Sequence, residues 1–439
     1  MTYHDALKYL DSLVNYEKAS NFDYKKSLKL ERMRSFARRL GNPHEGINAI
    51  HVAGTKGKGS VSSFVNSILM AAGFKTGLYT SPHLVSFRER IRINGEPISE
   101  EDVLRLMERL MPDIEVMARE EEKPTYFEIC TTIAFLYFKE NNVNFMVLET
   151  GMGGRLDSTN IVKPLVSVIT PISYDHVQHL GPGIEDIALE KSGIIKNDSV
   201  VISSPQTPEV LAVVERVAAK ANSKFYLTGR DSFCEKLNSD LERQIFHLIT
   251  KCGEYPHLEI RLLGDFQIQN AATAVLSVEG LRHYDVFIDK SAISDGLRNA
   301  RWPGRFEILR KNPLIVVDGA QNGQSASILK KAVKDNLNYK KLFLILGAMC
   351  DKDIDGICKE LSPAADYVIT TKAKSDRAAS PEFLRERMLN YKNMDVITTG
   401  SVGEAINKTL AIAGKDDAIL ITGSLYIVGE AIEAFRKLS

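Results

Sequence analysis

The chain alternates short apolar runs with longer stretches in which apolar residues recur every three or four positions. This alternation predicts strands followed by amphipathic helices. Helices are predicted over Ser60–Ala72 and Thr125–Asn141. Strands are predicted at Ile47–Ala53, Lys75–Thr80, Val143–Glu149 and Leu165–Thr170. Because these strands are apolar almost throughout, they belong in a parallel sheet that is covered on both faces. The first part of the chain is therefore predicted to be an α/β domain.

The same alternation begins again near residue 299. The segment from Asn299 to Gly304 holds the only tryptophan and a Pro-Gly pair, which indicates a domain boundary. Before it, Gln244–Thr250 and His257–Leu262 predict an antiparallel pair, and a long helix follows from Gln267 to about His283. Beyond it, strands are predicted at Leu314–Asp318, Leu342–Gly347, Tyr367–Thr370, Asp395–Thr398 and Ala418–Thr422. The prediction is an N-terminal α/β domain at 1–298, with a loop-rich insertion, and a Rossmann-like C-terminal domain at 299–439.

Composition narrows the functional classes. The chain has 439 residues, with 56 basic and 56 acidic side chains. Zero net charge argues against a nucleic-acid partner or a polybasic membrane surface. The apolar stretch Leu342–Met349 is too short to span a bilayer, and Asp5, Lys8 and Asp11 interrupt any secretory core. The five cysteines form no CxxC pair, so neither a disulfide framework nor a zinc site is indicated. A cytoplasmic enzyme with no membrane partner is expected.

A glycine-rich loop follows the first strand directly. The sequence GTKGKGS at 54–60 lies between a predicted strand and a predicted helix. In this context glycines let backbone N–H groups surround a phosphate, and a lysine supplies a point charge. The strict GxxxxGK[ST] pattern is not met, because Gly59 separates Lys58 from Ser60. A plain turn without nucleotide is the alternative, and an NAD fingerprint fits less well. The predicted nucleotide-binding residues are Gly54, Thr55, Gly57, Lys58, Gly59 and Ser60.

The loop closely resembles the GTNGKGS loop of the folylpolyglutamate synthase and dihydrofolate synthase family, a branch of the Mur ligase superfamily. Further motifs follow in the family's order: TSPHL (80–84), PTYFEICTTIAF (124–135), LETGMGGRLDSTN (148–160), DHVQHLG (175–181), EKSGIIK (190–196), LLGDFQIQNAATAV (262–275), WPGRFE (302–307), DGAQN (318–322) and GSLYIVGE (423–430). The resemblance covers the chain from residue 30 to residue 430. It implies a P-loop ATPase domain of the Mur ligase type at 1–298 and a glutamate ligase domain at 299–439.

The resemblance also implies an activity. Such an enzyme joins L-glutamate to a folate or dihydropteroate carboxylate and works as a monomer with ATP, Mg²⁺ and a monovalent cation. A carboxylate oxygen is a poor leaving group, so the acid is first phosphorylated by ATP, and the amine then displaces phosphate. The acyl phosphate must be kept from water, and closure of two domains can do this.

Metal ligands are implied at Ser60, Ser81, Glu149 and His176. Glu149 ends an apolar strand, at the edge where α/β enzymes collect functional groups. Taken without the resemblance, His176 is a surface-loop histidine and Ser81 a turn or cap before Pro82. The catalytic residues implied are Lys58, Asp157, His176 and Lys191.

Lys191 is expected to be carbamylated, as the matching lysine is in the family. On sequence alone, a lysine beside Glu190 in a helix would be a solvated ion-pair partner. Asn270, Arg305 and Asp318 are expected to contact ATP, Arg305 by a bidentate bridge to phosphate. The implied substrate residues are Phe127, Gly154, Arg155, Asp157, Gln321 and Ser424. A plain loop with a local Arg155–Asp157 pair is the alternative for that segment.

Three positions depart from the family pattern. Gln321 replaces the usual histidine, and a glutamine cannot titrate; Phe266 also replaces a histidine, and Lys56 replaces an asparagine.

A Mur-type ligase for a cell-wall UDP precursor is one alternative, although only about 45 residues precede the first strand. A regulatory module with a decayed site is another. Activity on dihydropteroate, in addition to folate, is expected to depend on Phe22–Lys29, taken as a flexible loop, and on Tyr126-Phe127, which could equally be core packing.

Overall fold

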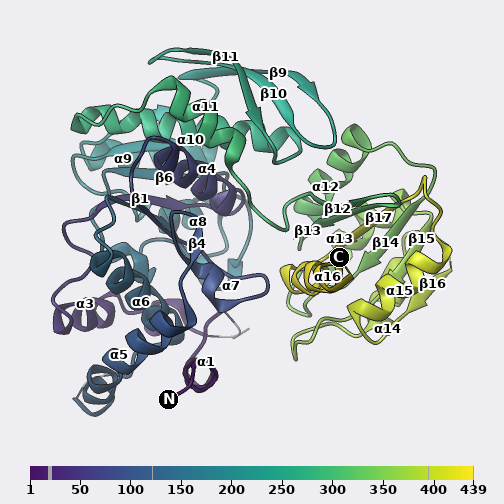
Figure 1. Ribbon diagram of the computed structural model, residues 1–439, viewed down its shortest axis with the longest axis horizontal. Helices are drawn as coiled ribbons and strands as arrows, with labels where there is room; N and C mark the ends of the chain where they lie inside the picture. Colours follow the sequence, from purple (N-terminus) through teal and green to yellow (C-terminus); the bar gives the residue numbers. More distant parts are fainter. Residues whose placement is uncertain (18–21, 121, 394, 439) are drawn as a thin grey trace.

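The computed structural model describes residues 1–17, 22–120, 122–393 and 395–438. Its larger sheet has eight strands in the order β4-β3-β2-β5-β1-β6-β7-β8 (Figure 1). The strands are β1 (Asn48–Ala53), β2 (Thr76–Tyr79), β3 (Ile91–Ile93), β4 (Glu96–Pro97), β5 (Phe145–Glu149), β6 (Val166–Ile169), β7 (Val200–Ser203) and β8 (Lys224–Leu227). All neighbouring pairs from β2 to β8 are parallel, and β3 and β4 extend one edge antiparallel. The predicted buried parallel sheet is confirmed.

Helices cover both faces of this sheet. One face packs against α4 (Lys58–Ala71), α10 (Asp265–Glu279) and α11 (Lys290–Asn299). The other face carries α1 (Tyr3–Asp11), α3 (Leu30–Arg39), α5 (Glu100–Glu120), α6 (Tyr126–Glu140), α8 (Ile184–Ser192) and α9 (Pro208–Lys220), with the one-turn helices α2 (Tyr24–Ser27) and α7 (Val177–Leu180). Successive side chains of a strand point to opposite faces, so Ile50 and Val52 join the first core while Ala49 joins the second.

A three-stranded antiparallel sheet lies beside α10 and α11 and reaches the C-terminal part of the chain, where Ser239 Oγ donates to Asn336 Oδ1 at 3.2 Å. It consists of β9 (Ser232–Ser239), β10 (Gln244–Thr250) and β11 (Glu254–Ile260), in the order β11-β10-β9. The predicted pair corresponds to β10 and β11, but β9 was not predicted. The helix predicted to reach about His283 ends at Glu279 and continues as a 3₁₀ turn, Gly280–Tyr284.

The second sheet has six strands in the order β12-β13-β17-β14-β15-β16. Its strands are β12 (Glu307–Lys311), β13 (Leu314–Asp318), β14 (Leu342–Leu346), β15 (Tyr367–Thr370), β16 (Val396–Thr398) and β17 (Ala418–Thr422). One face packs against α12 (Gly323–Asn336), α13 (Ile354–Leu361) and α14 (Pro381–Leu389), the other against α15 (Val402–Ile412) and α16 (Leu425–Leu438). The Rossmann-like prediction is confirmed, with the antiparallel edge strand β12 as an addition.

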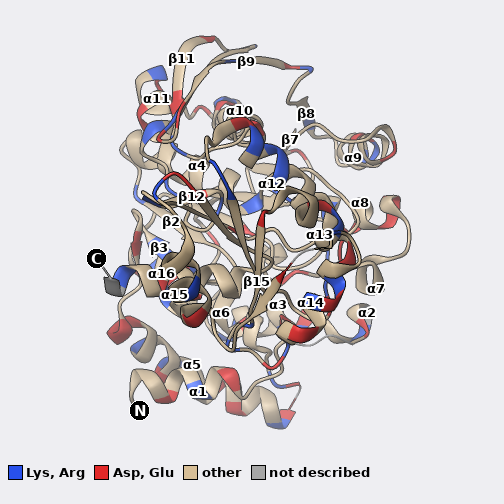
Figure 2. Cartoon of the chain, turned by 90° about the vertical axis from the view of Figure 1, so that its right-hand side faces the viewer, with Lys and Arg blue, Asp and Glu red and all other residues tan. Residues whose placement is uncertain are grey.

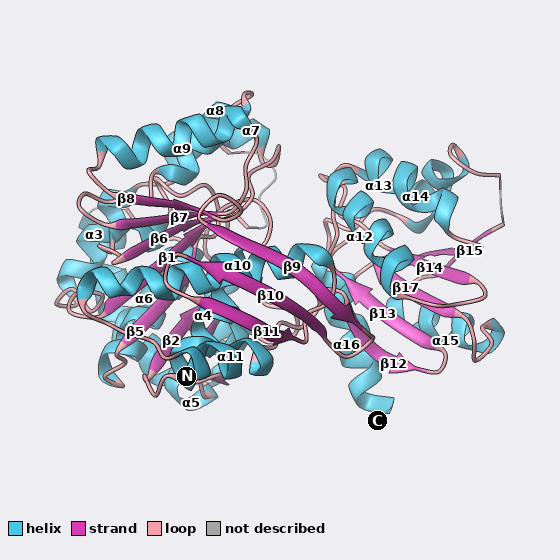
Figure 3. Ribbon diagram, turned by 90° about the horizontal axis from the view of Figure 1, so that it is seen from above, coloured by secondary structure: helices cyan, strands magenta, loops and turns pink. Residues whose placement is uncertain are grey.

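The two sheets lie side by side, each between its own helices (Figure 3). The chain crosses from one sheet to the other between Asn299, where α11 ends, and Glu307, where β12 begins. A domain boundary after residue 298 stays a prediction. The two parts touch where α16 meets the loop after β2, since a Cβ on Gly429 would lie 2.2 Å from the Leu84 carbonyl oxygen. Within the described residues no helix is long and apolar enough to cross a membrane.

Candidate active site

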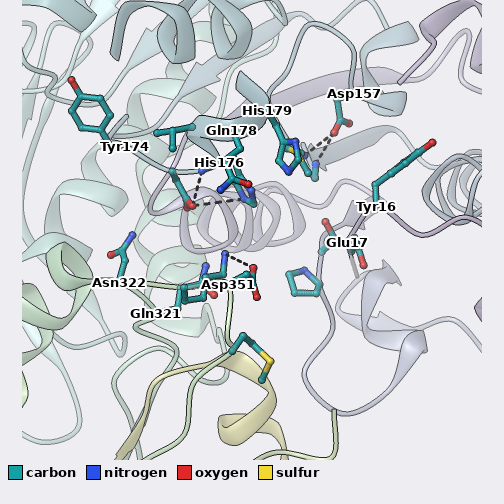
Figure 4. Close-up of a pocket in the computed structure, with 18 of the residues that line it drawn as sticks. Tyr16, Glu17, Asp157, Tyr174, His176, Gln178, His179, Gln321, Asn322 and Asp351 are labelled. Atoms are coloured by element: carbon teal, nitrogen blue, oxygen red, sulfur yellow. Dashed lines mark hydrogen bonds and ion pairs between the residues drawn. The ribbon is translucent and has the colours of Figure 1, made fainter. Parts of the chain in front are cut away.

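A cavity of about 1440 Å³ lies between the two sheets. Its walls include loops that follow β2, β5 and β6 on one side and β13, β14 and β17 on the other. These are the carboxyl ends of parallel strands, where α/β proteins place their ligands. Figure 4 shows His176 and Asp157 on the N-terminal side of this cavity, facing Gln321 and Asp351 on the C-terminal side. The predicted residues that line it are Ser81, Phe127, Asp157, His176, Gln321 and Ser424.

The glycine-rich loop adjoins this cavity. Thr55 Oγ1 donates a hydrogen bond to the carbonyl oxygen of Ser173, at 3.1 Å, and Ser173 lines the cavity. Gly57 has φ of 85°, a conformation that favours glycine, and α4 begins at the next residue. A Cβ on Gly57 would lie 2.6 Å from Asn270 Oδ1. The side chain of Asn270, on α10, therefore packs directly against the glycine-rich loop. The sequence therefore forms a cradle at a helix N-terminus, suited to phosphate.

Two lysines donate to the same carbonyl oxygen in this loop. Lys58 Nζ lies 3.2 Å and Lys191 Nζ 2.9 Å from the Gly54 oxygen. Lys191 is 4% exposed, so its reading as a solvated ion-pair partner is wrong. Burial, together with the Lys58 charge, lowers the pKa of Lys191 to about 7, although Asp175 opposes the shift. A large fraction of Lys191 is then a neutral amine at physiological pH.

Glu149 lies at the end of β5 and is 5% exposed. The Ser81 backbone N–H donates to its Oε2 at 3.3 Å. Burial raises the pKa of Glu149, while the charges of Lys58 and Arg305 and the Ser81 hydrogen bond oppose the rise. The cations around this carboxylate therefore do not fully compensate its burial, and a bound cation would do so.

His176 begins α7 in a left-handed conformation, with φ of 52°. Its Nε2 lies 3.9 Å from Asp175 Oδ1. Burial lowers the pKa of His176 to about 4, with the charges of Lys352, Lys191 and Lys58 acting in the same direction against Asp175. The imidazole is therefore neutral at physiological pH, the form that binds metal ions. The buried carboxylate of Glu149, the neutral imidazole of His176 and the hydroxyls of Ser60 and Ser81 are donor types that Mg²⁺ accepts. No set of three or more His, Cys, Asp or Glu ligands occurs among the described residues.

Asp157 and Arg155 do not pair with each other. Asp157 accepts hydrogen bonds from the backbone N–H groups of Gly151, at 2.9 Å, and Thr159, at 3.0 Å. Arg155 instead pairs with Glu190, with a shortest distance of 2.7 Å. The alternative of a local Arg155–Asp157 pair is therefore wrong. The loop also packs on α8, because a Cβ on Gly154 would lie 2.7 Å from the Lys191 carbonyl oxygen.

Arg305 and Asp318 meet on the C-terminal side of the junction. Asp318 ends β13 and accepts from the backbone N–H groups of Phe306, at 2.9 Å, and Ala320, at 2.8 Å. Burial raises the pKa of Asp318, and the Arg305 charge opposes the rise. A Cβ on Gly319 would lie 2.4 Å from Arg305 Nη1, so the guanidinium lies against the turn after β13. None of the loop residues 54–60 lines the cavity, and neither do Asn270, Arg305 and Asp318; Thr55 reaches the wall only through its hydrogen bond to Ser173.

Sequence reasoning missed Lys352 and left open whether Tyr126 and Phe127 belong to the core or to the site. Lys352 follows β14, lines the cavity with a side chain only 15% exposed, and lowers the pKa values of His176 and Lys56. Its place after a predicted strand was an available signal. Tyr126 is 5% exposed, and Arg90 Cζ lies 5.4 Å from the centre of its ring. Phe127, in contrast, lines the cavity. The segment taken as a flexible loop contains α2, with Tyr24 3% exposed.

Two protein-family models match the chain. The Mur ligase middle domain matches residues 52–278, and the glutamate ligase domain of Mur ligases matches residues 304–425. With the two-sheet fold and the phosphate loop, these matches define a Mur-type ATP-dependent ligase.

Comparison with whole proteins is more specific. The dihydrofolate synthase/folylpolyglutamate synthase of Bacillus subtilis (strain 168) is 36% identical over 409 residues, which cover 91% of this chain and 93% of that protein. The Mycobacterium tuberculosis folylpolyglutamate synthase complexed with ADP superposes with a TM-score of 0.90 at 32% identity, over 99% of this chain and 98% of that chain. An FPGS–AMPPCP–folate complex superposes with a TM-score of 0.84 at 30% identity, over 98% of each chain. The chain belongs to the folylpolyglutamate synthase/dihydrofolate synthase family.

Proposed function

We propose that this enzyme uses ATP to join L-glutamate to the carboxylate of a folate, and also to that of dihydropteroate. The observation that carries the proposal is the Thr55–Ser173 hydrogen bond, because it joins the phosphate loop directly to the wall of the cavity. An acid bound in the cavity can therefore meet a phosphate bound on the loop. Relatives with these functions in their names, and a solved complex that contains folate, support the substrate class.

The reaction divides into two displacements. A carboxylate oxygen of the acceptor attacks the γ-phosphorus of ATP, the bond to ADP breaks, and an acyl phosphate forms. The free amine of L-glutamate then attacks the acyl carbon, and phosphate leaves with the bonding electron pair. Lys58 and Arg305 are proposed to stabilise negative charge on the transferring group, Arg305 bidentately. Asn270 and Asp318 are proposed to hold the rest of the nucleotide beside the loop.

Ser60, Ser81, Glu149 and His176 are the proposed ligands of Mg²⁺. When bound, Mg²⁺ neutralises charge on the phosphate oxygens. The buried carboxylate of Glu149 and the neutral imidazole of His176 fit this role. No residues are assigned to a monovalent cation.

Lys191 is proposed to carry a carbamate. Its neutral amine attacks CO₂, a C–N bond forms, and one proton is released to solvent. A pKa of about 7 supports this step, since the protonated amine cannot react. The resulting anion would lie near Lys58 and Lys56, whose charges act on Lys191 in the protein.

Activity on dihydropteroate is the finer part of the proposal. Phe127 offers a ring at the cavity wall, where a Cβ on Gly151 would lie 2.7 Å from its Cζ. Gln321, Ser424 and Gly154 are proposed to shape the substrate site, and Gln321 can donate hydrogen bonds there but cannot accept a proton as base. Steady-state kinetics with dihydropteroate and with a reduced folate monoglutamate, at matched ATP and L-glutamate, tests both activities. Turnover of the folate alone would leave a monofunctional folylpolyglutamate synthase. Phosphate release without any acceptor dependence would contradict the ligase proposal. A monomeric state and a cytoplasmic location remain predictions.

A further inference from the structure

A fully buried histidine of β1 is connected to the wall of the large cavity by hydrogen bonds. His51 and Thr159 are both fully buried, and neither of them lines the cavity. Asp157 is buried too, but it does line the cavity. His51 Nε2 lies 2.8 Å from Thr159 Oγ1, which in turn lies 2.5 Å from Asp157 Oδ1. A chain of three polar side chains therefore runs from the strand before the glycine-rich loop to the cavity.

The direction of each hydrogen bond follows from the carboxylate of Asp157. It also accepts from the backbone N–H groups of Gly151, Met152 and Thr159, at 2.9, 3.1 and 3.0 Å. With these donors around it, Asp157 is ionised and can only accept. The Thr159 hydroxyl must then donate its single proton to Asp157. Because its oxygen is left to accept from His51, the imidazole proton lies on Nε2.

The surroundings of His51 keep this arrangement fixed. Burial lowers the pKa of His51 to about 3, and the charge of Lys196 acts in the same direction, so the imidazole is neutral and keeps one N–H group. His51 Nδ1 is buried and has no hydrogen-bond partner among the described residues. A proton on Nδ1 would therefore be a buried donor without an acceptor, which is costly. Only the Nε2–H form of the ring uses its proton.

Asp157 depends on these donors for its negative charge. Figure 2 shows acidic and basic residues on outer helices such as α5, α12 and α14, where water solvates them. Asp157 lacks that solvation: burial raises its pKa, and the Thr159 hydroxyl is the first of the donors that oppose the rise. The charge of Asp157 in turn acts on Glu149 and Lys191, two residues of the proposed reaction centre. Loss of the hydroxyl would weaken both the charge and the orientation of this carboxylate.

We propose that His51 and Thr159 are positioning residues of the reaction, which hold the Asp157 carboxylate and the loop 151–157 in the conformation that receives the acid. This inference rests on the proposed function. Neither residue touches the substrate, because each acts through Asp157. Gly151 and Met152, which donate to the same carboxylate, line the cavity where the acid is expected, whereas ATP is expected on the glycine-rich loop. Affinity for the acid should therefore depend on this chain more than affinity for ATP does.

Thr159→Val tests the proposal, because valine has nearly the shape of threonine but no hydroxyl. The KM for a reduced folate monoglutamate should rise on the order of tenfold, about the effect of losing one hydrogen bond to a charged group. The KM for ATP should stay within about twofold of the wild type. Thr159→Ser keeps the hydroxyl and should restore most of the affinity. Thr409→Val is the matched control, since Thr409 is equally buried and its hydroxyl donates to the Ala405 carbonyl oxygen in α15.

The histidine is tested by a second pair of variants. His51→Gln places an amide N–H group near the position of Nε2 and should keep the KM for the folate within a few-fold of the wild type. His51→Leu removes the donor and should raise this KM as Thr159→Val does, and it carries the same expectation if Thr159→Val does not fold. Because the two residues act in one chain, the double variant should be little worse than either single one. A merely structural role would lower the amount of folded enzyme and leave the KM for the folate unchanged.

NMR of the enzyme with isotope-labelled histidine supplies a readout that needs no turnover. The His51 signal is identified by its loss in His51→Gln. It should show the Nε2–H form in the wild type, and the Nδ1–H form should gain population in Thr159→Val. A proton on Nδ1 in the wild type would overturn the proposal, as would a KM for the folate in Thr159→Val no higher than in Thr409→Val. An equal rise in the KM for ATP would also overturn it, because the effect would then belong to the glycine-rich loop. Failure of the proposed function is a separate result, the absence of acceptor-dependent phosphate release in the wild type.

Discussion

Lys58 concentrates positive charge where a phosphate would lie, at the start of α4. We expect Lys58→Ala to lose a hundredfold or more in kcat, roughly the effect of removing a charged clamp from a transferring phosphate. Its thermal unfolding should remain close to that of the wild type, since among the described residues the lysine side chain hydrogen-bonds only to Gly54 of its own loop. Lys220→Ala, at an exposed position of α9, is the control. Undiminished kcat at saturating ATP would remove Lys58 from the mechanism.

The carbamate proposed for Lys191 gives a second prediction for a single side chain. Lys191→Ala should be inactive, and a short-chain carboxylic acid that occupies the vacated space should restore part of the activity. Wild-type enzyme kept free of CO₂ should lose activity and regain it when bicarbonate is added. Full activity without CO₂ would show that the free amine suffices.

His51 links stability to pH without belonging to the cavity lining. It is fully buried in β1, its Nε2 lies 2.8 Å from Thr159 Oγ1, and burial lowers its pKa to about 3. Between pH 6.5 and about 3 the unfolded chain therefore binds a proton that the folded chain does not, so stability falls as pH falls. The free energy of unfolding falls by about 1.4 kcal/mol for each pH unit in this range because of this one group. Urea unfolding at pH 6 and pH 5 should show a smaller loss of stability in His51→Leu than in the wild type. Equal losses would mean that His51 titrates normally.

Several of the predicted residues that line the cavity follow strands directly. Ser81 and Gln321 follow predicted parallel strands, and carboxyl ends of such strands meet at one edge. Lys352 occupies an equivalent place, yet its partners are Asp175, His176 and Lys56, which lie far away in sequence. Electrostatic interactions between residues of different domains leave no local pattern in the sequence. The hydrogen bonds of Asp157, in contrast, are all local, because their donors lie at residues 151–159. The spacing of residues in the sequence did not predict them either.

The helix α4 depends on the absence of a side chain at Gly59. A Cβ on Gly59 would lie 2.5 Å from the Trp302 ring, so the interdomain segment packs directly on the phosphate loop. In Gly59→Ala, either the phosphate loop or the Trp302 ring should be displaced. The fluorescence emission of Trp302 should shift, and the KM for ATP should rise several-fold. Gly403→Ala in α15 is the matched control: nothing lies within 4 Å of its added Cβ, and the change should be neutral or slightly stabilising. An unchanged KM in Gly59→Ala would show that the contact relaxes at no cost to binding.

Prediction of elements succeeded for many strands with both faces buried, although the fully buried β7 was not predicted. β13, β15 and β17 were predicted with their observed bounds, because continuous apolar runs leave few alternatives. The strands β3, β4, β7 and β8 were not predicted, and neither were β9 and β12. β9 exposes most of its residues, and β12 is partly exposed along its length, so neither presents an apolar run. Both are edge strands, defined by pairing with a neighbour rather than by their own composition.

The two domains are also joined by the N-terminal segment. Arg377 donates through Nη1 to the Glu17 carbonyl oxygen at 2.8 Å and pairs through Nη2 with Asp351 at 2.6 Å. The Glu17 carboxylate in turn contacts the buried Arg90 at 2.6 Å. Glu17, Asp351 and Arg377 line the cavity, and Figure 4 shows Glu17 and Asp351 at its edge.

Loss of this connection should admit water. We expect Arg377→Gln to release more phosphate than it forms amide product, because the acyl phosphate is hydrolysed before the amine attacks. The measurement is the ratio of phosphate to glutamylated product, with Arg385→Gln on α14 as control. A ratio that stays at one would show that other contacts exclude water.

The division of the cavity between two separate sheets affects how its specificity can change. Phe127 and Met152 reach the cavity from the N-terminal domain, whereas Gln321 and Ser424 come from the C-terminal domain. If the acid is recognised mainly by the first set and the amino acid by the second, either partner can be exchanged without redesign of the other. Exchange of the C-terminal domain between relatives then offers a route to ligases that attach a different amino acid to the same acid.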